Sequence, residues 1–173
     1  MDPRRHCTGH RQDCFSVLSE AQMLVLNYVL SSTPTPQMTS GDLRLADEAK
    51  LRYDILLGDI IFTAEQCDFS MHWGWVPIID FAACMIQAKN DLLACDGARS
   101  IVDFTESDDK VSFVRYSDEV VVSGSYVSCQ ANVTLEELSI AVDSFRDRLL
   151  EYISLNYPPL FENRELRRIL DCR

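Results

Sequence analysis

The sequence contains no long apolar run. A membrane-spanning helix needs about 20 predominantly apolar residues, and Gln, Asn, Asp or Lys interrupts every candidate segment of this 173-residue chain. The amino terminus lacks a secretory pattern, because Arg4 and Arg5 are followed by polar residues instead of a continuous apolar segment. From these two absences we predict a protein that does not enter a membrane and resides in the cytosol.

Recognisable catalytic motifs are also missing. The chain has no Gly-x-Ser-x-Gly, no Gly-Lys-Ser/Thr and only six glycines, which argues against a serine hydrolase or a phosphate-binding loop. A cysteine nucleophile needs a histidine base, and His72 follows Cys67 closely in the chain. We favour a structural interpretation, a loop histidine near a small buried thiol, because nothing in the sequence orients such a dyad. We therefore predict that the protein is not an enzyme and uses no cofactor.

Basic residues are scarce relative to acidic ones. Sixteen Lys and Arg against 27 Asp and Glu give a formal net charge of -11. This charge repels phosphate backbones and anionic membrane surfaces, which argues against nucleic acid as a ligand. The same charge favours a basic protein partner, because complementary charges speed the encounter and penalise wrong partners.

Cysteines are frequent but have no repeated spacing. Their number is odd, and in a reducing compartment we expect thiols, several of them buried as small apolar side chains. His6, Cys7, His10 and Cys14 could offer soft ligands to a zinc ion, but their spacing matches no standard half-site, so no metal site is predicted. The seven cysteines are Cys7, Cys14, Cys67, Cys84, Cys95, Cys129 and Cys172.

The first half of the chain predicts a tail followed by mixed elements of one domain. Residues 1–14 predict a flexible basic tail, and residues 15–173 predict a single domain with a sizeable core. Apolar residues from Phe15 to Leu30 recur at helical spacing, although Val25 to Leu30 could also pair as a strand. Residues 50–63 alternate around Gly58-Asp59, which predicts a hairpin. A loop is expected over residues 67–74.

The stretch from Trp73 to Leu93 predicts the structural centre. Two tryptophans lead through Pro77, which suits a first helical turn, into a helix with one apolar face. Gly97 can adopt the left-handed geometry that ends such a helix. Whatever precedes and follows this helix must cover its apolar face.

The second half predicts a meander and two further helices. Short apolar segments between Ser100 and Val133 alternate with turn residues, so adjacent strands must be antiparallel. Thr134 and Glu137 form a capping-box pattern before a helix that runs to about Leu155. A last amphipathic helix covers residues 162–170. The predicted fold is α+β: an antiparallel meander sheet of about four to six strands packed against two main helices, with N- and C-terminal helices.

Acidic residues concentrate at the turns of this meander. Between Ile101 and Ile153 there are eleven acids and four bases, so 4 - 11 gives -7. Such a surface can simply keep a protein soluble, but it can also dock a cationic partner. The first candidates for partner contact are Asp108, Asp109, Asp118 and Glu119.

A second candidate site lies around Trp73, Trp75 and Asp80. Ligand sites are mostly apolar with a few placed polar groups, so these residues could form a pocket for a small ligand or an enzyme's substrate. The alternative is structural. Tryptophans often belong to the core, and a carboxylate in a first helical turn is favoured by the helix dipole.

Several segments together resemble a known group of proteins. They are Val76 to Ala82, Asp103 to Ser107, the meander, the helix from Leu135, and Tyr157-Pro158-Pro159-Leu160 before Asn163. Over residues 50–170 the chain resembles small uncharacterised bacterial α+β proteins that are similar to immunity proteins of polymorphic toxin systems. The resemblance implies a protein that neutralises a cognate toxin by occluding its active site or a required surface, and it assigns no functional residue. A structural subunit or homo-oligomer is a further alternative.

Overall fold

The computed structural model describes residues 24–32, 42–105 and 107–171. The predicted tail and the four histidines and cysteines considered as zinc ligands lie outside these residues. Within them the α+β class is confirmed, with two antiparallel sheets of four strands each and helices packed around them. The strands were expected to form one sheet, so the division into two sheets corrects that detail.

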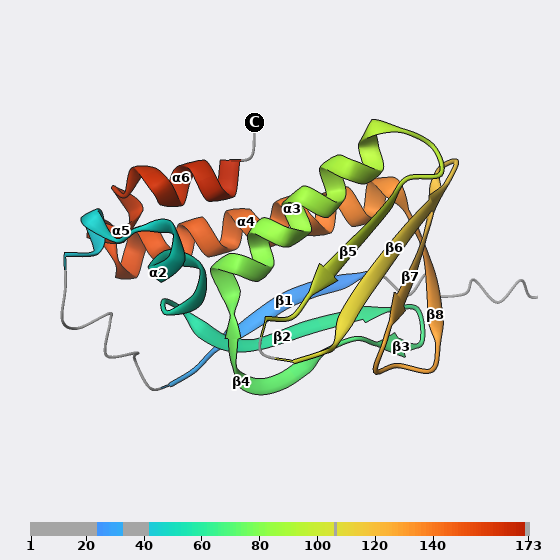
Figure 1. Ribbon diagram of the computed structural model, residues 1–173, viewed down its shortest axis with the longest axis horizontal. Coiled ribbons are helices and arrows are strands. Elements are labelled where there is room, and N and C mark those ends of the chain that lie inside the picture. The colour runs from blue at the N-terminus through green and yellow to red at the C-terminus, as the bar shows by residue number, and fades with distance from the viewer. Residues whose placement is uncertain (1–23, 33–41, 106, 172–173) are drawn as a thin grey trace, which may run out of the picture.

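Helix α3 (Ile78–Ala94) is the centre of the fold, as its apolar sequence predicts. It contacts both sheets and the helices α2, α4 and α6 (Figure 1). Its buried side chains point in several directions, because neighbours surround it. Pro77 is its N-cap, and Gly97, just beyond its end, adopts φ +75°. One continuous apolar core joins these elements, and its largest fully buried rings are Phe62, Phe69, Phe113 and Phe145.

The first sheet is built around β2 (Leu57–Ala64). On one side β2 pairs with β1 (Val25–Leu30), and on the other it pairs with β3 (Cys67–Asp68) and β4 (Met71–Pro77). Residues of β2 alternate between buried and half-buried, which is the pattern of a sheet with one covered face. The covered face packs towards α3 and the second sheet.

The second sheet is the predicted meander. Its strands are β5 (Arg99–Asp103), β6 (Lys110–Tyr116), β7 (Glu119–Gly124) and β8 (Gln130–Thr134), and each pairs with the next in antiparallel register. Short turns join them, as the sequence predicts. The meander therefore places successive turns at opposite ends of the sheet.

Helix α4 (Leu135–Asn156) follows β8 through the predicted capping box, in which Thr134 Oγ1 accepts from the Glu137 amide and the Glu137 carboxylate accepts from the Thr134 amide. Lys89 of α3 and Asp143 of α4 form an ion pair at 2.6 Å. The chain ends in α5 (Pro158–Phe161) and α6 (Arg164–Asp171). Buried Asn163 caps α6 and donates to the carbonyls of Leu43 and Ala46, which fixes α6 beside the short helix η1 (Leu43–Leu45).

Three local predictions are wrong. The helix expected from Phe15 to Leu30 is strand β1 over its described part, because β2 pairs with it residue for residue. Residues 48–53 form helix α2 (Glu48–Tyr53), and β2 runs straight through Gly58 without a turn. The loop expected over residues 67–74 contains β3 and most of β4.

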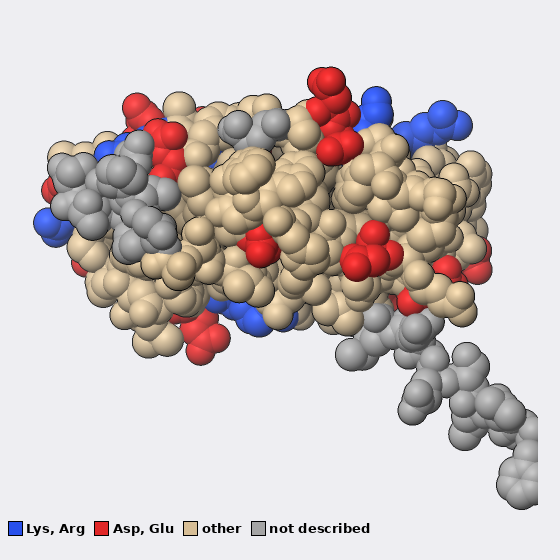
Figure 2. Space-filling view, turned by 90° about the horizontal axis from the view of Figure 1, so that it is seen from below, with Lys and Arg blue, Asp and Glu red and all other residues tan. Residues whose placement is uncertain are grey.

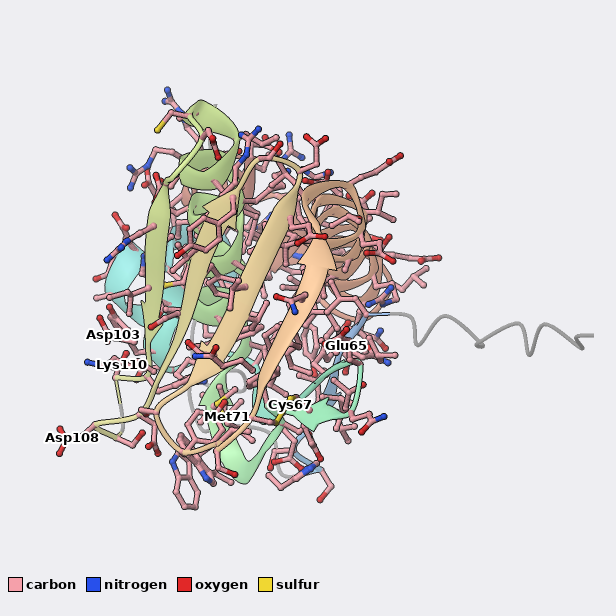
Figure 3. The ribbon with its side chains drawn as sticks, turned by 90° about the vertical axis from the view of Figure 1, so that its right-hand side faces the viewer. Glu65, Cys67, Met71, Asp103, Asp108 and Lys110 are labelled. Atoms are coloured by element: carbon pink, nitrogen blue, oxygen red, sulfur yellow. A yellow bond between two sulfur atoms is a disulfide. The ribbon has the colours of Figure 1, made fainter. Side chains whose placement is uncertain are left out.

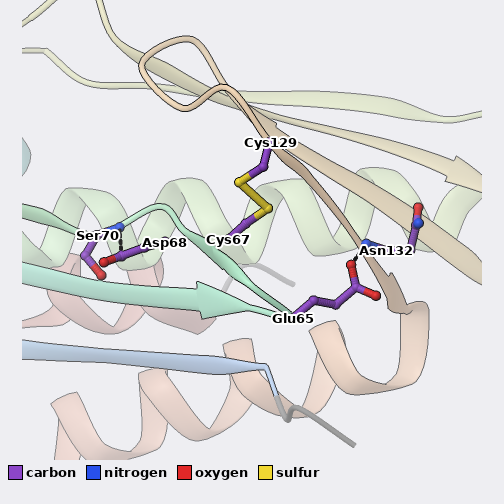
Figure 4. The surroundings of a disulfide bond; sticks show 6 residues. All are labelled: Glu65, Cys67, Asp68, Ser70, Cys129 and Asn132. Carbon is purple, nitrogen blue, oxygen red and sulfur yellow. Dashed lines mark hydrogen bonds between the residues drawn. A yellow bond between two sulfur atoms is a disulfide. The ribbon is translucent and has the colours of Figure 1, made fainter.

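A disulfide joins the two sheets. Cys67 of β3 and Cys129, which precedes β8, are bonded with their Cα atoms 6.0 Å apart (Figure 4). Nearby, the Glu65 carboxylate accepts a hydrogen bond from the Asn132 amide at 3.0 Å. The expectation that every cysteine is a thiol is therefore wrong for Cys67 and Cys129. Neither spacing nor composition identifies which two of the seven cysteines pair.

Candidate functional site: an aromatic and acidic surface

An irregularity in β4 presents two tryptophans. Gly58 of β2 lies opposite Val76, and Ile60 lies opposite Met71. The single residue between them in β2, Asp59, is therefore matched by residues 72–75 of β4. Such bulges re-aim side chains. The Asp59 carboxylate accepts a hydrogen bond from the Gly74 amide at 2.6 Å, and Gly74 has φ +74°, a conformation that favours glycine.

Trp73 and Trp75 lie on either side of this glycine, with stacked rings whose centroids are 6.3 Å apart. Trp75 is 54% exposed, which is unusual for so large an apolar side chain. Trp73 is half-buried, and its ring meets the edge of Phe104 from the other sheet at 6.0 Å. Trp73 therefore packs against the residue that follows β5, and Trp75 stacks on its exposed side.

Behind Trp73 lies a narrow crevice. It is bounded by β4, the start of α3 and the end of β5, and it holds about 10 Å³, the space of one water. Phe81 and Phe104 stack at 6.1 Å to form part of its wall. Trp73 and Asp80, two of the three predicted pocket residues, line the crevice together, whereas Trp75 lies on the open surface.

Asp80 is committed to an ion pair. Its carboxylate accepts from Arg52 Nη1 at 2.7 Å, and its side chain is only 12% exposed. Arg52 also binds Glu48 at 2.9 Å. The negative charge of Asp80 is the main cause, ahead of burial, of a raised pKa of the nearby Tyr53 hydroxyl. Asp80 therefore joins α3 to α2 through its ion pair with Arg52.

The four acidic candidates do not form one patch. Asp108 and Asp109 precede β6, whereas Asp118 and Glu119 follow it, so the two pairs lie at opposite ends of this strand. Seven residues of β-strand span about 23 Å. A single partner side chain cannot contact both pairs.

Only the first pair lies near the tryptophans. Asp103 lines the crevice beside Trp73, and the Phe104 amide donates to the Asp109 carbonyl at 3.1 Å. The carboxylate of Asp109 is held by the hydroxyls of Ser107 and Ser125. Asp108 is exposed and points away from the body of the protein (Figure 3).

The segment from Asp103 to Lys110 therefore adds negative charge to an aromatic surface. It contains four acidic residues and one lysine. That lysine, Lys110 of β6, lies opposite Asp103 of the neighbouring strand β5 in the backbone register. We call Trp73, Trp75, Asp103 and Asp108 the aromatic–acidic surface. Cations are attracted to the faces of tryptophan rings and to carboxylates, so this surface suits a guanidinium or ammonium group.

The side of the molecule where β4 lies is poor in basic residues. Figure 2 shows this side mostly uncharged, with acidic side chains scattered within it and basic ones at its margins. Protein interfaces share this character, with few charges and enriched aromatic residues near the centre. The surroundings of the tryptophans thus resemble an interface in composition.

Three other features considered in the sequence can be compared with the described residues. Cys67 is bonded to Cys129 and cannot act as a nucleophile, which removes the dyad with His72. Among residues 24–32, 42–105 and 107–171, no three His, Cys, Asp or Glu side chains gather as metal ligands would. In the same part of the chain, no helix is both long and apolar enough to cross a membrane.

Sequence reasoning missed three residues that build this surface: Asp59, Asp103 and Phe104. The sequence predicts Asp59 in a turn, and its bond to Gly74 depends on the irregular pairing of β2 with β4. The proximity of Phe104 to Trp73 arises from packing between two sheets and has no local signal. No family model matches the chain, and no curated protein or solved structure matches it either.

Proposed function

We propose that the protein acts by binding a cationic protein through the aromatic–acidic surface. The observation that carries the proposal is the exposed Trp75 stacked on the half-buried Trp73, with Asp103 beside Trp73 and Asp108 exposed on the segment that follows. A Lys or Arg side chain over a tryptophan face contributes about 0.5–2 kcal/mol, depending on its desolvation. The acidic segment adds long-range attraction, which mainly raises the rate of encounter.

Neutralisation of a bacterial toxin is the biological role that we propose for this binding. The protein would cover the active cleft of the toxin, or a surface that the toxin requires, and would need no catalytic group to do so. The resemblance to immunity proteins and the net charge of -11 support this proposal. A toxin domain encoded immediately upstream would be independent support.

The crevice favours surface contact over enclosure of a small molecule. Ligand pockets usually hold about 300–1,000 Å³, whereas the crevice behind Trp73 holds about 10 Å³. A metabolite would have to displace Trp73 or Phe104 from their mutual contact. A partner side chain laid over Trp75 requires no such rearrangement.

The structure supplies a matched pair of variants for the test. Asp103→Asn with Asp108→Asn removes two charges from the Asp103–Lys110 segment, which begins beside Trp73, and Asp118→Asn with Glu119→Gln removes two charges at the far end of β6. With a partner recovered by co-purification, we expect the first pair and Trp75→Ala to weaken binding at least about tenfold. The second pair should change the affinity less than about twofold. Equal losses from both pairs, or an affinity independent of salt, would disprove the proposal.

A further inference from the structure

The backbone of β1 has one edge directed away from β2. The backbone amide of Phe62 donates to Ser70 Oγ, and its carbonyl accepts from the Phe69 amide. Both backbone groups of Phe62 therefore point towards β3 and away from β1. Leu26, which lies opposite Phe62, therefore directs its own amide and carbonyl to the outer edge. The alternation continues, because the Ser31 amide donates to Leu57 on the β2 side. The edge groups belong to Leu24, Leu26, Tyr28 and Leu30.

Within the described residues, β1 itself has no sequence feature that blocks pairing, and the contact found on its edge is the one that Arg148 makes with the Leu26 carbonyl. Strand edges are commonly blocked by lysine, proline, bulges or an inward charge. The sequence of β1 is Val-Leu-Asn-Tyr-Val-Leu, without charge or proline, and its register with β2 is continuous. Val25 and Val29 are 40% and 56% exposed on its outer face. The strand therefore offers an uncharged, β-forming edge.

A groove runs beside the same edge. It lies between β1 and α4, which run side by side in Figures 1 and 4 and contact each other. Its volume is about 530 Å³. On the helix side its wall consists of the small residues Ala141 and Ser144 and of Ile140, which is 58% exposed. An extended segment beside β1 would place alternate side chains against this wall.

Among the described residues that line the groove, Arg148 is the basic one. Arg148 lines it and donates to the Leu26 carbonyl at 2.5 Å, so the guanidinium already binds the edge of β1. Glu137, the acidic residue at the other end, is committed to the capping box. A carboxylate on an incoming segment would complement Arg148 through a charge-assisted hydrogen bond.

We propose that β1 is an acceptor strand: an extended segment of a partner protein, apolar at alternate positions and with an acidic side chain opposite Arg148, adds to the first sheet in this groove. Main-chain hydrogen bonds supply affinity in such complexes, and alternate side chains supply specificity. The groove is separate from the aromatic–acidic surface. The inference therefore stands independently of the proposed function.

The probe is a nine-residue peptide with blocked termini, alternating valine and threonine, with glutamate at one central position. Binding of the peptide is detected by NMR from the amide hydrogen exchange of the full chain. We expect exchange at Leu26 and Tyr28 to slow at least about tenfold in saturating peptide. Asn27 and Val29 are internal controls, because their amides already pair with β2. The same peptide, N-methylated at the amides that would face β1, should leave exchange unchanged.

A second arm tests the charge. The glutamate peptide should bind about two- to fivefold more tightly than the same peptide with glutamine, and Arg148→Gln should abolish this preference. The Asp103→Asn, Asp108→Asn variant should bind both peptides like the unaltered protein, which separates this inference from the proposed function. Unchanged exchange at Leu26 and Tyr28 would overturn the proposal. The proposal would also be overturned if the Leu26 and Tyr28 amides of the protein without peptide exchanged slowly and this protection disappeared on dilution. A second copy of the chain would then occupy the edge of β1.

Discussion

The carboxylate of Asp59 in β2 accepts a hydrogen bond from the backbone amide of Gly74 in β4 at 2.6 Å, at the point where the pairing of the two strands is irregular. This bond fastens the backbone of the bulge at Gly74, the residue between Trp73 and Trp75. The Asp59 side chain is 28% exposed, so the bond is partly shielded from water. It is one of the contacts that hold the tryptophan pair, together with the packing of Trp73 against Phe104.

Removal of the Asp59 carboxylate should loosen the tryptophans. We predict that Asp59→Ala lowers the free energy of unfolding by about 1–3 kcal/mol, because the Gly74 amide loses its acceptor. The tryptophan fluorescence of the folded protein should shift towards that of solvated indole. Asp59→Asn is the control, because its side-chain carbonyl can still accept the bond. An unchanged spectrum for Asp59→Ala would show that other contacts hold the bulge.

Asp80 is predicted to matter for stability. Asp80→Asn leaves the Arg52 guanidinium with Glu48 as its remaining carboxylate, and we expect a loss of about 1–3 kcal/mol in urea unfolding. Asp147→Asn is a matched control, because Arg146 also has two acidic partners but Asp147 is 65% exposed. Its effect should stay within about 0.5 kcal/mol. Similar losses for both variants would contradict the assignment of Asp80 as a structural residue.

The capping box of α4 should make stability depend on pH. The Thr134 backbone amide, and then its hydroxyl, lower the pKa of Glu137 below its ordinary value of 4.5. The folded state thus favours the ionised carboxylate. This contribution is complete above that ordinary value and is lost as the pH falls through the lower pKa of the folded state.

Glu137→Gln tests this contribution. Glutamine also serves in capping boxes, so the variant should keep most of its stability near neutral pH. Below about pH 4.5 its stability should fall less steeply than that of the unaltered protein, because it has no carboxylate to protonate at this position. Unfolding followed by circular dichroism across this range measures it. Glu136→Gln, in the same helical turn, is the control and should decline like the unaltered protein. Thr134→Ala should cost about 1 kcal/mol at neutral pH.

The Cys67–Cys129 disulfide should stabilise the fold substantially. It closes a loop with a sequence separation of 62, for which the chain-entropy estimate is about 4 kcal/mol. We predict that Cys67→Ser with Cys129→Ser lowers the thermal midpoint to about the value measured in reductant. Mass spectrometry of non-reduced digests should recover the two cysteines in one linked peptide. Disulfides persist in oxidising compartments and are rare in the cytosol, so this bond does not support the cytosolic location that the sequence predicts.

Much of the second half of the fold could be predicted, because its signals are local. The turns of the meander and the Thr134 capping box each act within a few residues. The first half depends on distant contacts. Gly58 resembles a turn residue, yet a Cβ there would lie 2.2 Å from the Val29 carbonyl oxygen, so glycine serves the close approach of two strands. Leu51 of α2 and Ile55, just beyond its end, are buried four residues apart, and over so short a segment this spacing is hard to distinguish from the alternation of a strand.

The candidate site shows the same division. Trp73 and Asp80 are close in sequence, and the start of α3 brings both to one crevice. The separation of Asp108 from Asp118 follows from the predicted meander itself, because successive turns of a meander alternate between its ends. The contribution of Phe104 could not be predicted, because it depends on how two sheets pack.

The bond between Cys67 and Cys129 makes the intervening chain a closed covalent ring, and the aromatic–acidic surface lies entirely on that ring. A protease that cuts once beside the exposed Asp108 would open the ring but release no fragment. The nicked chain would migrate as one species on a gel without reductant and as two with it. Partner binding could therefore survive a cut in its own contact loop until the disulfide is reduced.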